Sequence, residues 1–112
     1  MLVKRVGSAF VNTELSEILD GLDALKEGKR SIVVVGMESS DCINNTVRHG
    51  ADLGYQMVVV VDACAAHEVP DYRQKGKVLS AEETHEAAMV VLANFAKLTT
   101  TNELLEEIGL VA

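Results

Sequence analysis

Residues 31–42, SIVVVGMESSDC, are the strongest indication of the fold in this sequence. The first part of this stretch, 31–36, runs β-branched residues together without the polar–apolar alternation of a half-exposed strand. Such a run is typical of a strand buried on both faces, as in parallel sheets. A short polar turn over 37–41 follows, and Cys42 begins a helix expected over 42–53. A buried strand that turns directly into a helix predicts an α/β protein.

The flanking segments continue the alternation of helices and strands. Apolar residues at helical spacing predict a helix over 13–27, with Asn12 or Thr13 as its cap and Gly28 as its end. A second valine run predicts a buried strand over 56–61. The chain of 112 residues is therefore expected to form one α/β domain, 1–112, with right-handed crossovers.

The C-terminal third of the chain predicts shorter elements. Ser80 and Glu83 have the spacing of a capping box, which predicts the start of a helix there. The expected elements are a loop over 63–79, a helix to about residue 97, a possible edge strand over 98–100, and a last helix that begins with a capping box at Thr100 and Glu103 and ends near Gly109.

Two strongly buried strands and one weak strand make a thin sheet. The strand 32–35 is apolar on both faces and prefers neighbours on both edges, since a long apolar edge invites aggregation. We therefore expect a homo-oligomer, or a complementing chain that covers this edge. A stretch of strands that this sequence does not contain is the other possibility.

Composition narrows the functional classes. The formal net charge is −7, and no run of basic residues predicts binding to nucleic acid or to an anionic membrane. No apolar stretch approaches the ~20 residues that span a bilayer, and the N-terminus does not resemble a secretory signal, so a cytoplasmic protein is expected. Two cysteines and three scattered histidines predict neither a disulfide framework nor a metal site, and no cofactor is expected.

Cys42 is the candidate nucleophile. It lies beyond the carboxyl end of a parallel strand, where α/β proteins bind ligands, and at a helix start, where unpaired N–H groups favour a thiolate. The same amides could donate to an oxyanion formed when the thiolate attacks a carbonyl. The alternative is that Cys42 is a small buried apolar residue, which is the commoner role of a free cysteine.

Other polar residues have weaker claims to a chemical role. Cys64 follows the second strand without a helix start behind it, so a place in the core or in a pocket wall is favoured. His67 is interpreted as a solvated loop residue, and His49 and His85 as surface or packing residues. Asp62 could contact a ligand, but a role in holding a loop by hydrogen bonds is favoured.

Several segments, in this order, resemble the isochorismatase-like cysteine hydrolases. The segment 36–46, GMESSDCINNT, resembles their nucleophile turn, and 4–10, KRVGSAF, resembles their lysine segment. Gly54-Tyr55, Asp62-Ala63 and the 83–86 region match at the expected spacing. The resemblance implies a three-layer α/β/α sandwich with a mainly parallel sheet.

The resemblance also implies a reaction. Cys42 would be the nucleophile and Lys4 the triad lysine that helps to keep the thiol ionised. The backbone amides of Glu38 and Cys42 would form the oxyanion hole, and the Met37–Glu38 peptide is a candidate cis bond. The substrate would be a small amide or carbamoyl compound; substrate-binding residues are not assigned.

The sequence departs from the family pattern at its N-terminal side. The triad aspartate normally precedes the lysine segment, but only three residues precede Lys4. The chain is thus expected to be the C-terminal portion of such a hydrolase domain, without its first strands and without an assignable general base. An alternative function is a catalytically incomplete, hydrolase-like module for binding or assembly.

Overall fold

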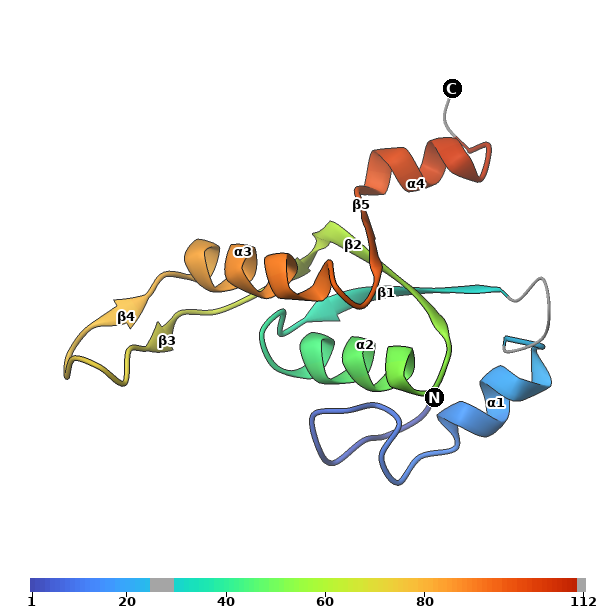
Figure 1. The fold of residues 1–112 in the computed structure, drawn as a ribbon, viewed down its shortest axis with the longest axis horizontal. Helices are drawn as coiled ribbons and strands as arrows, with labels where there is room; N and C mark the ends of the chain where they lie inside the picture. The colour runs from blue at the N-terminus through green and yellow to red at the C-terminus, as the bar shows by residue number, and fades with distance from the viewer. Residues whose placement is uncertain (25–29, 111–112) are drawn as a thin grey trace.

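The computed structural model describes residues 1–24 and 30–110. Helices and strands alternate along these residues, as the sequence predicts, except that three strands follow one another between residues 56 and 79 (Figure 1). The elements are α1 (Leu15–Gly21), β1 (Ser31–Met37), α2 (Cys42–Asp52), β2 (Gln56–Ala65), β3 (Val69–Pro70), β4 (Val78–Leu79), α3 (Ala81–Leu92), β5 (Lys97–Thr99) and α4 (Thr101–Glu107).

The main sheet is parallel and has the strand order β1-β2-β5. Val34 of β1 pairs with Val59 of β2, and Val59 in turn pairs with Leu98 of β5. The register between β1 and β2 shifts beyond Val34, so that Gly36 pairs with Cys64. The predicted parallel sheet with a short third strand is therefore confirmed.

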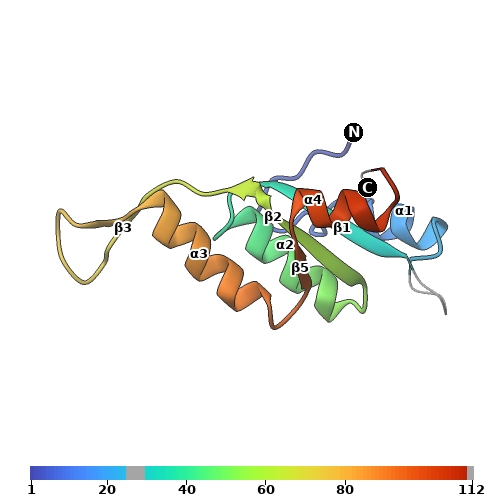
Figure 2. The same cartoon turned by 90° about the horizontal axis from the view of Figure 1, so that it is seen from above.

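Helices lie on both faces of the sheet. Figure 2 shows α2 and α3 together on one face and α4 on the other. Two consecutive right-handed crossovers through α2 and α3 place these helices on the same side. The arrangement is a three-layer α/β sandwich, as predicted.

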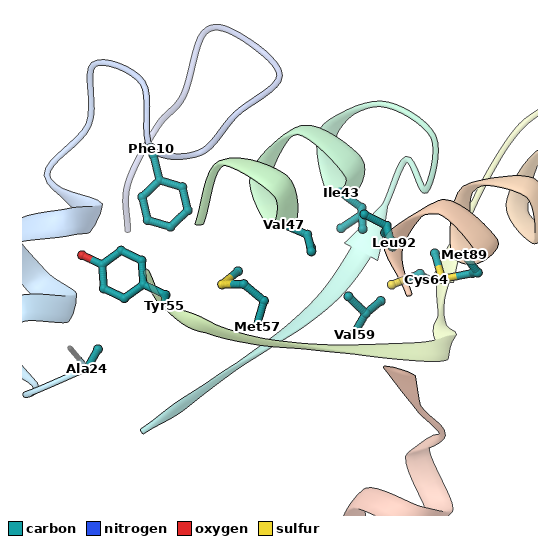
Figure 3. Close-up of a cluster of buried hydrophobic side chains, with 10 residues drawn as sticks. All are labelled: Phe10, Ala24, Ile43, Val47, Tyr55, Met57, Val59, Cys64, Met89 and Leu92. Carbon is teal, nitrogen blue, oxygen red and sulfur yellow. The ribbon is translucent and has the colours of Figure 1, made fainter. Parts of the chain in front are cut away.

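The core lies between the sheet and the layer of α2 and α3. Val47 of α2, Val59 of β2 and Leu92 of α3 are fully buried. Figure 3 shows the cluster of ten buried side chains: Phe10, Ala24, Ile43, Val47, Tyr55, Met57, Val59, Cys64, Met89 and Leu92.

An aromatic pair attaches the N-terminal segment to this core. Phe10 and Tyr55 stack with ring centroids 5.6 Å apart. The Tyr55 hydroxyl donates to Asp20 Oδ1 at 2.9 Å. Burial, followed by this carboxylate hydrogen bond, raises the pKa of Tyr55. Phe10 and α1 are thereby held beside the amino end of β2.

The two valine strands differ in burial. Met57 to Val60 of β2 are buried, as predicted. β1 is an edge strand of the described sheet, and Val33 and Val35 are 45% and 57% exposed, so the prediction of burial on both faces is wrong for β1. Ile32 and Val34 pack against the core, which leaves the opposite face of β1 open.

The first helix is shorter than predicted, and its predicted caps are wrong. α1 ends at Gly21, because Asp23 takes a left-handed conformation (φ 62°) and Ala24 N donates back to Leu19 O at 3.1 Å. Its N-cap is Glu14, while Thr13 Oγ1 accepts from Leu15 N at 3.3 Å. Gly28, the predicted end of the helix, lies outside the described residues.

The segment 63–79 is not the loop that was predicted. β2 continues to Ala65, and β3 and β4 form a two-stranded antiparallel hairpin. α3 ends at Leu92 instead of residue 97, because the chain turns there to enter β5.

The two predicted capping boxes have different outcomes. The box of Ser80 and Glu83 is confirmed in both directions. At the second, Thr100 caps α4 as predicted, but the Glu103 side chain accepts from Thr99 Oγ1 at 3.3 Å.

Candidate active site

The turn between β1 and α2 has an unusual backbone. The Met37–Glu38 peptide is cis. The Glu38 carbonyl accepts from Ile43 N at 3.0 Å and from Asp41 N at 3.2 Å, which closes the turn onto the first residues of α2. Ser39 N donates to Ala65 O at 2.8 Å, so the turn is also tied to the end of β2.

Cys42 is the first residue of α2, and Lys4 lies against its thiol. Lys4 Nζ is 3.2 Å from Cys42 Sγ and donates to Val6 O at 2.9 Å. Cys42 is partly exposed, and Lys4 is exposed. The structure therefore brings together two residues that are 38 positions apart in the sequence.

The N-terminal segment holds Lys4 in place through contacts with α2. Ala9 N donates to Thr46 Oγ1 at 2.9 Å. Gly7 lies so close to Asn45 that a Cβ at this position would be 2.7 Å from Asn45 Nδ2. A side chain at position 7 would push the segment away from the helix, and Lys4 with it.

Glu38 has a role that the sequence analysis missed. Its side chain is 9% exposed and accepts from Ser40 N and Ser40 Oγ through Oε1, and from His67 N at 2.9 Å through Oε2. Burial alone would raise the pKa of Glu38, but the hydrogen bonds from Ser40 and His67 outweigh burial and lower it. The carboxylate joins the turn after β1 to the chain after β2. Its position directly after a strand of the parallel sheet was the available signal.

Cys64 is in the core, not at the site. It belongs to β2, is 9% exposed, and its Sγ is 3.9 Å from Val34 O. Burial raises the pKa of this thiol, although a hydrogen bond with the Gly36 backbone lowers it in part. The favoured interpretation of Cys64 as a core residue is confirmed, but its predicted position beyond the strand is wrong.

The His67 side chain is solvated, as predicted. It is 70% exposed, and its Nδ1 is 3.7 Å from Glu38 Oε2. Its backbone N–H makes the hydrogen bond that attaches this residue to the turn.

Asp62 holds the start of α4. Its Oδ1 accepts from Thr101 N at 2.8 Å and from Thr101 Oγ1 at 2.9 Å. The backbone hydrogen bond, followed by the hydroxyl hydrogen bond, lowers the pKa of Asp62. The favoured role in holding the chain by hydrogen bonds is confirmed.

His49 and His85 have packing roles, as predicted. His49 Nδ1 is 2.7 Å from Ser8 Oγ, and its ring lies 5.3 Å from that of Phe10. His85 Nδ1 is 2.7 Å from Ser39 Oγ, which attaches the turn to α3. The contact of Ser39 with His85 was not expected from sequence.

Two expectations from the composition can be compared with the structure: that the chain has no metal site and that it has no membrane-spanning segment. Within residues 1–24 and 30–110, no three His, Cys, Asp or Glu side chains are grouped to hold a metal ion. Nor does this part of the chain contain a helix of the length and apolarity needed to cross a membrane.

Comparisons with known proteins point to one family. The family model of the isochorismatase domain matches residues 1–103. The uncharacterized isochorismatase family protein YddQ of Bacillus subtilis (strain 168) is 36% identical over 107 residues, which cover 95% of this chain and 55% of YddQ.

Solved structures give the same result. A cysteine hydrolase from Pseudomonas syringae pv. phaseolicola 1448A matches with a TM-score of 0.82 and 28% identity, over 96% of this chain and 47% of that one. A pyrazinamidase/nicotinamidase from Streptococcus mutans UA159 matches with a TM-score of 0.63 and 26% identity, over 86% of this chain and 44% of that one. The chain spans 42% to 55% of the length of the curated relatives that it matches.

Proposed function

The chain belongs to the isochorismatase family, and from this premise we propose that it hydrolyses a small amide or carbamoyl compound through the Cys42 thiolate. The observation that carries the proposal is the 3.2 Å contact between Lys4 Nζ and Cys42 Sγ at the start of α2. An ammonium group and a helix N-terminus both stabilise a negatively charged sulfur.

The proposed reaction has two stages. The thiolate attacks the carbonyl carbon of the amide, and the C–N bond then breaks to release ammonia or an amine, leaving a thioester on Cys42. In this proposal, Lys4 donates the proton that the leaving nitrogen needs. Water then attacks the thioester carbonyl, the C–S bond breaks to release the acid, and the remaining proton returns to Lys4, which restores the thiolate.

The backbone amides of Glu38 and Cys42 are proposed as the oxyanion hole. Within the described ranges, none of the hydrogen bonds has either N–H as its donor. Free amides at a fixed turn are suited to a charge that develops only during the reaction. The buried Glu38 carboxylate helps to fix this turn and takes no part in the proton transfers.

The general base is the missing component. Across the described parts of the chain, no hydrogen bond or ion pair joins Lys4 or Cys42 to an aspartate. We propose that residues 1–112 form the C-terminal portion of a hydrolase domain, and that a complementing polypeptide along the open edge of β1 supplies the carboxylate. A strand added there in parallel would end beside the Cys42 turn.

The names of structural neighbours support the substrate class. One neighbour is named a cysteine hydrolase and another a nicotinamidase, a name that denotes cleavage of an amide. We also propose a cytoplasmic location, because a reducing compartment keeps a catalytic thiol free. Cell fractionation would test it, and recovery in the culture medium would contradict it.

Ammonia release from a panel of small amides tests the function. The chain is assayed alone and with the part of YddQ that it does not match, added as a separate polypeptide. We expect turnover that Cys42→Ala abolishes and that Cys64→Ala leaves largely intact, because Cys64 lies away from Lys4. If no amide is turned over in either condition, the proposal is wrong.

The rate of labelling by iodoacetamide tests the lysine separately from turnover. Lys4→Met should slow the alkylation of Cys42, because the thiolate loses the ammonium group beside it. Arg5→Met is the matched control, since it removes a neighbouring charge in the same segment. Equal rates in the two variants would remove Lys4 from the mechanism.

The second candidate is a binding or assembly module without catalysis. The open face of β1, where Val35 and Met37 are 57% and 66% exposed, favours it. Sedimentation equilibrium of the purified chain tests this alternative. A monomer at all concentrations, together with a fast-reacting Cys42, would contradict it.

A further inference from the structure

The β3–β4 hairpin forms an arm that leaves the body of the molecule. We define the arm as residues 69–79; Figures 1 and 2 both show it extending away from the sheet. Asp71 N donates to Lys77 O at 2.9 Å, and Arg73 holds the Asp71 carboxylate at 2.8 Å, so the turn is ordered by its own contacts. Tyr72, near its tip, is 96% exposed.

A pocket lies at the base of the arm, between α2 and α3. Its volume is about 300 Å³, and its wall is mostly apolar, formed among others by Val69, Leu79, Ala88 and Val91. Thr84 also lines it, is 5% exposed, and its hydroxyl has no hydrogen-bond partner among the described residues. A buried hydroxyl without a partner is destabilising, so an occupant with a polar group is favoured there.

The arm and α3 carry opposite charges. The arm has three basic residues and one aspartate, and is therefore positive in a chain whose net charge is −7. α3 has three glutamates and no lysine or arginine. The basic residues are Arg73, Lys75 and Lys77, and the glutamates are Glu82, Glu83 and Glu86.

We propose that two copies of this chain exchange arms about a twofold axis, so that Tyr72 of each copy occupies the pocket of the other. The occupant is a second copy because one chain carries both halves of the contact, as an isologous interface requires. Tyr72 lies near the tip of the arm and the pocket at its base. Two arms lying antiparallel therefore place each tip at the base of the other.

The two surfaces of the proposed contact are chemically complementary. The Tyr72 ring supplies a large apolar surface to the apolar wall, and its hydroxyl reaches the unpaired hydroxyl of Thr84. Lys75 and Lys77 of the arm then lie along the acidic face of α3 of the other copy, while Arg73 stays with Asp71 of its own arm. This contact is separate from the open edge of β1 and does not depend on the proposed hydrolase function.

Sedimentation velocity over a range of concentrations tests the arm exchange. We expect a dimer whose dissociation constant rises roughly tenfold or more in Tyr72→Ala, because a buried aromatic side chain is lost from the interface. Tyr72→Phe should weaken it by a smaller factor, since only the hydroxyl is lost. Val35→Ala, which removes apolar surface at the edge of β1, is the matched control and should leave the dimer unchanged.

Charge exchange gives a test that a misfolded variant cannot imitate. One double variant carries Lys75→Glu and Lys77→Glu, and the other carries Glu82→Lys and Glu86→Lys. Each double variant alone should form a weaker dimer. A mixture of these two double variants should dimerise again, because each then meets opposite charges in the other copy. A monomer at every concentration would overturn the proposal, as would a dimer that Tyr72→Ala leaves intact.

Discussion

β1 and β2 are neighbours in the sheet and have nearly the same valine run, but their surroundings differ. Val59 of β2 has a paired strand on each side and is fully buried, whereas Val35 of β1 is 57% exposed. A valine run thus predicts the type of sheet, whereas the presence of neighbouring strands determines how far each strand is buried.

The cysteines near the carboxyl ends of the two strands differ in the same way. Cys42 follows β1 across a turn and is in contact with Lys4, whereas Cys64 is still within β2 and belongs to the core. A place near the end of a parallel strand is therefore not sufficient for a chemical role. Contacts from distant parts of the chain distinguish the two thiols.

The largest expected effect is a difference in stability between the two valine runs. Val59→Ala should lower the free energy of unfolding by about 2.5 kcal/mol, because it opens a cavity in the core. Val35→Ala should change it by no more than about 0.5 kcal/mol, because the side chain is exposed. Urea unfolding followed by circular dichroism measures both. Equal losses would mean that both faces of β1 are covered in solution.

The next effect concerns Glu38, which ties the carboxyl ends of the two strands together. Glu38→Gln should cost about 2 kcal/mol at neutral pH, because the amide cannot accept all the hydrogen bonds that the carboxylate accepts. The folded-state pKa lies below the ordinary 4.5, so the stabilisation is complete above that pH and is lost as the pH falls through the folded-state value.

The test is urea unfolding of both proteins from pH 7 downward. The difference between wild type and Glu38→Gln should shrink as the pH falls below 4.5. Glu17→Gln, on the exposed surface of α1, serves as the control and should show little difference at any pH. If the difference in the free energy of unfolding between wild type and Glu38→Gln did not change with pH, the charge of Glu38 would not stabilise the fold.

A smaller effect is expected at the point where the register of β1 and β2 shifts. Gly36 has φ 129°, a conformation that an alanine adopts only with strain, although the nearest atom to an added Cβ is 3.8 Å away. Gly36→Ala should therefore cost about 1–2 kcal/mol through backbone strain alone. Gly21→Ala, in open space at the end of α1, is the control. Thermal unfolding measures both variants. Equal midpoint temperatures would mean that Gly36→Ala introduces no backbone strain.

The smallest expected effect compares the two thiols directly. Cys42 should react with iodoacetamide on the order of tenfold faster than Cys64, because burial both covers Cys64 and raises its pKa. Mass spectrometry of Cys42→Ser and Cys64→Ser separates the two rates. Faster labelling of the variant that retains Cys64 would mean that β2 opens more readily than the core contacts indicate.

Much of the fold could be predicted from local patterns. The parallel sheet follows from the valine runs, and the helix starts follow from features that lie within four residues, such as Ser80 with Glu83. The burial of β1 was mispredicted because it depends on what lies beside the strand. The β3–β4 hairpin was missed because its paired strands are only two residues long and have no alternation to detect.

The candidate site likewise has features that local sequence predicts and contacts that it does not. The place of Cys42 at the start of a helix follows from its own neighbourhood. Its pairing with Lys4 was expected only from the family resemblance, because no local rule joins residues 38 positions apart. The roles of Glu38 and Ser39 were missed because their partners, His67 and His85, come from other elements.

The contact of Asp62 with Thr101 has a consequence for the order in which the chain assembles. α4 has seven residues, too few to form a stable helix in isolation. Its first turn is held by a carboxylate that lies 39 residues earlier, at the end of the valine run. The last helix is therefore complete only after β2 has taken its place, and hydrogen exchange in its first turn will report on the integrity of the sheet.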